Sequence, residues 1–125
     1  MFGWFRKDRA PTKGPDFRSV DSPAKAAELV RGGEFQRILL LPSEFGGEDI
    51  APNCVFVPAW AAEKKAGIDN NIVRKLVSEG KVSRYRASPK YQGKSFVPSA
   101  ITIVASDPGS FSITINIWGD ALEKE

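Results

Sequence analysis

Histidine is absent from this chain of 125 residues, and cysteine occurs only once, at Cys54. Histidine is the commonest general base and metal ligand near neutral pH, so the chain lacks a histidine-activated nucleophile and a Cys/His zinc cluster. A single cysteine forms no internal disulfide, and its apolar setting in residues 53–57 is typical of a small core residue. We therefore interpret the chain as non-enzymatic, with no expected cofactor or metal ion.

Other absences narrow the functional classes further. No apolar run reaches the roughly 18 residues that a membrane-spanning helix needs. In residues 1–9 the apolar side chains precede the charges, which is the reverse of a signal peptide, and Phe2 replaces the glycine that N-myristoylation requires. Neither a GxGxxG or GxxxxGK[ST] phosphate loop nor a GxSxG nucleophile elbow occurs. These absences favour a cytoplasmic protein outside the common nucleotide-binding and hydrolase classes.

The charge is unevenly placed along the chain. Residues 1–18 carry five bases and two acids, which accounts for the whole net charge of +3. Within the remainder, residues 32–63 hold five acids and one base, whereas residues 74–94 hold seven bases and one acid. If folding placed these blocks on separate surfaces, the resulting dipole would steer a charged partner. The alternative is that both blocks solvate the domain and neutralise each other.

Local signals divide the first half of the chain into helices and strands. Asp21 or Ser22 can cap a helix that starts at Pro23 and stops at Gly32. Apolar runs that end at a proline predict strands. A glycine after a helical run predicts the end of that helix, and a capping residue such as Asp69 predicts the start of the next. The resulting elements are a helix over 24–31, strands over 35–41 and 53–57, a loop over 42–49, a helix over 59–66 that stops at Gly67, and a helix from Asp69 to Gly80.

The last third predicts three strands, over residues 82–87, 96–105 and 111–118, with a turn at Asp107-Pro-Gly between the last two. Opposed residues in an antiparallel pair share a face, so their numbers must sum to an even total. Isoleucines occupy alternate positions in both of the last strands. We therefore expect Ile103 opposite Ile115 and Ala105 opposite Ile113.

The predicted fold class is α+β, with about five mostly antiparallel strands, a C-terminal meander and two to three helices on one face. We expect a flexible basic tail over residues 1–20, a single domain over 21–120 and a disordered end over 121–125.

Two charged segments are candidate contact surfaces. The glycine-rich loop 42–49 can receive a basic partner, although a solvated turn is the alternative, and it lacks the alternating Asp/Asn pattern of an EF-hand. The segment 81–96 interleaves bases with aromatic residues, as single-stranded nucleic acid requires, but inward-packing tyrosines explain the same pattern. Exposed tryptophans mark interfaces, and burial in the core is the alternative for both Trp60 and Trp118. The candidate partner-binding residues are Glu44, Phe45, Glu48, Asp49, Arg84, Arg86, Lys90, Lys94, Trp60 and Trp118.

Four turn-like and aromatic segments carry a resemblance to known proteins. Residues 42–49, 53–58, 68–69 and 91–98 resemble a group of small bacterial proteins, some of which are similar to immunity proteins that neutralise toxins of polymorphic secretion systems. The resemblance covers roughly residues 35–118 and implies a bacterial, cytoplasmic protein whose partner is a toxin domain.

The leading functional hypothesis is a protein-interaction domain, with an immunity-type inhibitor as its most concrete form. One alternative is a nucleic-acid-binding module that uses residues 81–96. A second alternative is a peripheral membrane protein that inserts residues 1–9 into a membrane interface.

Overall fold

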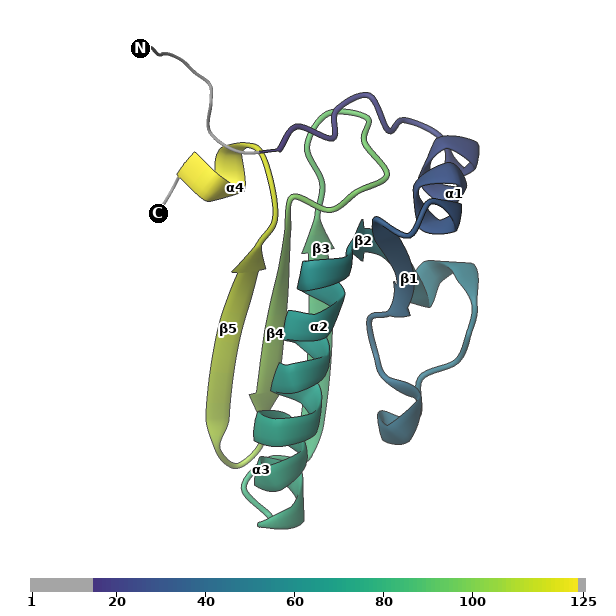
Figure 1. The fold of residues 1–125 in the computed structure, drawn as a ribbon. Coiled ribbons are helices and arrows are strands. Elements are labelled where there is room, and N and C mark those ends of the chain that lie inside the picture. The colour runs from purple at the N-terminus through teal and green to yellow at the C-terminus, as the bar shows by residue number, and fades with distance from the viewer. Residues whose placement is uncertain (1–14, 124–125) are drawn as a thin grey trace.

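The computed structural model describes residues 15–123, which form an α+β domain (Figure 1). The helices are α1 (Pro23–Arg31), α2 (Ala59–Gly67), α3 (Arg74–Ser78) and α4 (Asp120–Glu123). The strands are β1 (Phe35–Leu39), β2 (Cys54–Pro58), β3 (Arg84–Lys90), β4 (Ala100–Ser106) and β5 (Ser110–Asn116). The predicted α+β class is therefore confirmed.

The strands form two antiparallel sheets. β1 pairs with β2, and β3, β4 and β5 form a meander in which β4 is central. Between β1 and β2, the side chain of Asn53 accepts a hydrogen bond from the backbone N–H of Leu41 and donates one to its carbonyl oxygen, at 2.8 and 3.0 Å. These bonds fix the loop that carries the 3₁₀ turns Ser43–Phe45 and Ala51–Asn53. The pattern of strands in the sequence does not reveal this division into two sheets.

The helical segment after β2 is continuous, so the predicted break at Gly67 is wrong. Gly67 has helical dihedral angles of φ −63° and ψ −43°, and a π-helical stretch over Ile68–Val73 joins α2 to α3. Ile68 and Val73 are buried, and the carboxylate of Asp69 bonds to other side chains instead of capping a new helix. Tertiary contacts therefore override the local stop signal of the glycine.

The register of the last hairpin agrees with the sequence in parity but not in position. Ile103 lies opposite Ile113 and Ala105 opposite Phe111, so each partner is two residues earlier than expected. The alternation of apolar residues determines only which face each side chain occupies. The position is set by the turn, where Ser106 already pairs with Ser110 and Asp107 adopts a positive φ of 76°.

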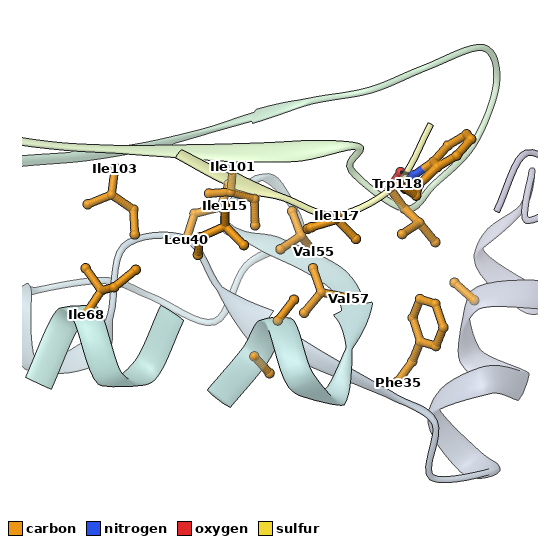
Figure 2. Close-up of a cluster of buried hydrophobic side chains, with 14 of the residues drawn as sticks. Phe35, Leu40, Val55, Val57, Ile68, Ile101, Ile103, Ile115, Ile117 and Trp118 are labelled. Carbon is orange, nitrogen blue, oxygen red and sulfur yellow. Dashed lines mark hydrogen bonds between the residues drawn. The ribbon is translucent and has the colours of Figure 1, made fainter. Parts of the chain in front are cut away.

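The core lies between the inner face of the three-stranded sheet, the α2–α3 helical segment and the β1–β2 hairpin (Figure 2). Figure 2 shows Ile103 of β4 above Ile68, and Ile115 of β5 close to Leu40 and Val55. Trp118, just after β5, is fully buried and donates its indole N–H to the carbonyl oxygen of Val97 at 2.9 Å. This indole closes the end of the core.

The described part of the core begins before the predicted domain boundary. The ring of Phe17 packs edge-on against Phe35 and Trp118, at centroid distances of 5.0 and 6.1 Å, and Val20 is buried. At the other end of the chain, residues 120–123 form α4 where a disordered end is predicted. Residues 1–14 of the tail predicted over 1–20, and the predicted membrane contact of residues 1–9, lie outside the described residues. Within residues 15–123, no helix is long and apolar enough to cross a membrane.

Candidate functional site

The three-stranded sheet exposes one face, which we call the outer face. The helical segment covers the opposite, inner face (Figure 1). Along β3 the burial alternates strictly, so that every second side chain is exposed. The outer face consists of Arg84, Arg86, Ser88 and Lys90 on β3, Thr102, Val104 and Ser106 on β4, and Ser110, Ser112 and Thr114 on β5. It therefore combines a row of basic side chains on β3 with hydroxyl side chains on all three strands.

The outer face is positive because none of its three strands contains an acidic residue. Among the described residues, Arg86 and Lys90 form no ion pair, and Arg84 forms one with Asp107 of the β4–β5 turn, at 3.2 Å. Both groups of that pair are exposed, so it neutralises Arg84 weakly. Arg84, Tyr85 and Arg86 of β3 line a hollow of about 410 Å³ together with Val104 and Ser106 of β4. This hollow can accept acidic side chains at its rim.

Lys94 does not belong to the outer face. It lies in the loop after β3, near Asp21 at the start of α1. The pKa of Asp21 is lowered mainly by its hydrogen bond to Lys25 and also by the charge of Lys94. The structure therefore brings together three of the four predicted bases of this segment, and it separates the fourth.

Tyr85 lines part of the hollow between Arg84 and Arg86, but the aromatic rings of the basic segment do not lie in the row of exposed bases. Tyr85 points to the inner side of the sheet, where its ring packs against Phe45 at a centroid distance of 5.4 Å. Tyr91 and Phe96 are 46% and 40% exposed, but both lie in the loop beyond β3. Among residues 15–123, the arginines therefore have no exposed aromatic ring beside them on which nucleobases could stack, as single-stranded nucleic acid binding requires.

The predicted acidic loop divides into two parts. Asp49 forms an ion pair with Arg37 of β1 at 2.7 Å, and the hydrogen bond from that guanidinium lowers the pKa of Asp49. Glu48 is exposed nearby. Glu44, in contrast, lines a hollow of about 440 Å³ together with Phe45 and Arg84. Part of the acidic loop therefore adjoins the end of the basic row.

The two predicted tryptophans have opposite environments. Trp60, in the first turn of α2, is 46% exposed and remains available for contact. Trp118 is fully buried, so its assignment as a partner-binding residue is wrong. Its side chain replaces a polar residue in the alternation of the last strand because the segment leaves the sheet there and turns into the core.

The structure contains a buried polar network that the sequence analysis does not predict. The ammonium group of Lys65 donates hydrogen bonds to Oδ2 of Asp69 at 2.6 Å and to the hydroxyl oxygen of Tyr85 at 3.1 Å. The hydroxyl of Tyr85 donates to Oδ1 of Asp69 at 2.7 Å. Lys65 and Asp69 are only 3% and 4% exposed. Their separation of four residues was the available signal, but it indicates one helical face only if the helix continues through Gly67.

This network is better suited to fixing the fold than to chemistry. Burial, and then the hydrogen bond to Asp69, raise the pKa of Tyr85 far above its ordinary value, so the hydroxyl stays protonated. An activated nucleophile or general base needs the opposite shift. Lys65 and Asp69 also line an open cavity of about 270 Å³, but both are already hydrogen-bonded to each other and to Tyr85.

Cys54 and the carboxylates offer no further chemical site in the described part of the chain. The Cys54 thiol donates to the carbonyl oxygen of Ile50 at 3.1 Å, and burial is the main cause of its raised pKa, which keeps it a thiol. Within residues 15–123, no three Cys, Asp or Glu side chains gather closely enough to hold a metal ion.

The fold and this surface define a class: a small α+β domain with one covered sheet face and one open, basic sheet face. Comparisons with protein-family models, with curated proteins and with solved structures found no match to this chain.

Proposed function

We propose that this chain is a non-enzymatic protein-interaction domain that binds an acidic partner protein through the outer face of its three-stranded sheet. The observation that carries the proposal is the row of Arg84, Arg86 and Lys90 on β3, exposed over a sheet face with no acidic residue in its strands. An immunity-type inhibitor, as the sequence resemblance implies, is the most concrete form of this function.

The physical basis is electrostatic complementarity on a preorganised surface. β3 is paired with β4 along its whole length, so the backbone that carries the three bases is rigid. Within residues 15–123, Arg86 and Lys90 form no ion pair that a partner carboxylate would have to displace, which lowers the cost of binding it. An arginine can bind a carboxylate through two hydrogen bonds, which adds geometric specificity.

A protein partner is favoured over nucleic acid because the aromatic residues lie away from the basic row. Tyr85 is committed to Lys65 and Asp69 on the inner side of the sheet. The hydroxyl groups of Ser88, Thr102 and Ser112 surround the bases instead, and such groups suit the polar rim of a protein interface.

The test is a charge reversal on the outer face. Partners are captured from a lysate of the source organism with the full chain and with the double variant Arg86→Glu/Lys90→Glu, and affinities are then measured by calorimetry with each purified partner. We expect the variant to lose at least about 10-fold in affinity, with a weaker salt dependence, because like charges then face each other.

The matched control is Lys64→Glu/Lys75→Glu, which makes the same change of charge on the exposed side of the helical segment. It should bind like the original chain. Equal binding by both double variants would refute the outer face as the site. Capture of single-stranded nucleic acid, with loss of binding as salt rises, would favour the nucleic-acid alternative.

A further inference from the structure

The two edges of the three-stranded sheet differ in their protection against pairing with another strand. β3, at one edge, carries Arg84, Arg86 and Lys90 and also Pro89, and charges and proline are the usual devices that block edge pairing. β5, at the other edge, has the sequence Ser-Phe-Ser-Ile-Thr-Ile-Asn and contains neither a charge nor a proline. No described strand pairs with its outer side.

The register shows which backbone groups of β5 face this open edge. Pro89 has no N–H, so it suits a position of β3 that points away from β4. Its partner Ile101 must then direct its own backbone groups towards β5, where it lies opposite Ile115. The N–H of Ile117 donates to the carbonyl oxygen of Ser99 at 2.7 Å, which agrees with hydrogen bonding between odd-numbered residues of the two strands.

The odd-numbered residues of β5 therefore bond to β4, and the intervening residues direct their N–H and C=O groups outwards. Ser112 and Thr114 are the two such residues in the middle of the strand, and both have exposed side chains. The burial of the inner-face side chains agrees with an unpaired edge at β5. Ile103 and Ala105 of β4 are completely buried, whereas their partners Ile113 and Phe111 on β5 are only partly buried.

We propose that β5 pairs in antiparallel fashion with β5 of a second copy of this chain, which forms a symmetric dimer with one continuous six-stranded sheet. The pairing that uses the whole strand places the two-fold axis at Ile113, the central residue of Ser110–Asn116. Ser112 then lies opposite Thr114 of the second copy and exchanges backbone hydrogen bonds with it.

A second copy is favoured as the occupant because the strand complements itself. Opposed residues in this register have numbers of equal parity, so Phe111 and Ile113 meet apolar residues while Ser112 and Thr114 meet polar ones. The absence of charge on β5 means that self-pairing brings no like charges together. The dimer also leaves the outer face open and places its two basic rows at opposite edges of the joined sheet.

The test is sedimentation velocity of the full chain from low to high micromolar concentration, where we expect a concentration-dependent dimer of twice the chain mass. The variant Ser112→Lys/Thr114→Lys should weaken dimerisation at least about 10-fold, because lysines then lie opposite lysines across the axis. Ser112→Glu/Thr114→Glu should do the same. Circular dichroism verifies that both variants remain folded.

Mixing the two variants supplies the decisive measurement. The lysine and glutamate variants should form a heterodimer together, since opposite charges then face each other in the same register. A chain that stays monomeric at every concentration would overturn the proposal. So would a lysine variant that dimerises as tightly as the original chain, or variants that fail to associate on mixing. Arg86→Glu/Lys90→Glu should still dimerise, so this result is independent of the proposed function.

Discussion

At the scale of single residues, the buried Lys65–Asp69 pair shows how a polar group can specify a structure without adding much stability. Removing two charges from water costs free energy that their mutual attraction only partly returns. The hydroxyl of Tyr85 hydrogen-bonds to both charged groups and links the helical segment to β3, 16 residues beyond Asp69. The network therefore aligns the helix with the strand that carries the basic row.

Tyr85 also makes a testable contribution to stability that depends on pH. Its pKa is higher in the folded chain than its ordinary value of 10.0, so above about pH 10 the unfolded chain loses this proton first. The resulting stabilisation is complete below pH 10 and declines as the pH rises further. We expect Tyr85→Phe to lower the free energy of unfolding by about 1–2 kcal/mol at neutral pH, because the hydrogen bonds to Lys65 and Asp69 are lost.

Urea unfolding at neutral pH and above pH 10 measures both effects. The difference between the original chain and Tyr85→Phe should shrink at the higher pH, since only the original chain loses stability through this group. Tyr91→Phe serves as the control for a tyrosine that is 46% exposed. A constant difference across the pH range would contradict the assigned role of the Tyr85 hydroxyl.

At the scale of elements, the continuous helix through Gly67 determines whether Gly67→Ala raises or lowers the stability of the protein. Gly67 has helical dihedral angles, and a Cβ atom added there would meet only the side-chain amide of Asn71, at 4.0 Å. Gly67→Ala should therefore raise the free energy of unfolding by about 0.5–1 kcal/mol. If the helix ended at Gly67 with a left-handed glycine, the same change would destabilise the protein.

Chemical denaturation of Gly67→Ala and Gly47→Ala gives the comparison. A Cβ atom at Gly47 would overlap the carbonyl group of Leu41, so that variant should be destabilised. Loss of stability in Gly67→Ala would contradict the continuous helix.

The elements also show where sequence information stops. Alternating isoleucines predict that the last strands share an apolar face, and the structure agrees, because a shift of one residue would expose half of these side chains. A shift of two residues keeps every side chain on its face, so the pattern could not predict that Ile103 pairs with Ile113. Gly67 misled the prediction for a different reason. The helix propensity of a glycine is only about 1 kcal/mol less favourable than that of alanine, which is less than the free energy gained by burying the helix that contains it.

At the scale of the whole molecule, the candidate site was predictable in its composition but not in its assembly. The bases of residues 84–90 occupy alternate positions, which the sequence shows, and strand geometry places Arg84, Arg86 and Lys90 on one face. Contacts between distant segments are invisible in the sequence. They bring Glu44 beside Arg84, carry Lys94 towards Asp21 and bury Trp118.

The segment before α1 tests this assembly, because it closes the end of the core on which Trp118 lies. Phe17 contacts both Phe35 and Trp118, and its carbonyl oxygen accepts a hydrogen bond from the hydroxyl of Ser95 at 2.7 Å. Phe17→Ala should cost about 2–4 kcal/mol of stability and should open Trp118 to solvent. Denaturant unfolding measures the first effect, and quenching of tryptophan fluorescence by acrylamide measures the second.

Phe17→Leu is the control, since it retains most of the apolar volume and should lose less than half as much stability. Trp60 is already exposed and should be quenched equally in all three proteins. If residues 15–20 were part of a flexible tail, as the sequence predicts, Phe17→Ala would leave both stability and quenching unchanged. A marked loss of stability together with stronger quenching would instead place this segment in the cooperative core. Removing the Phe17 side chain can expose the indole of Trp118, 101 positions along the chain, only if the two side chains pack together.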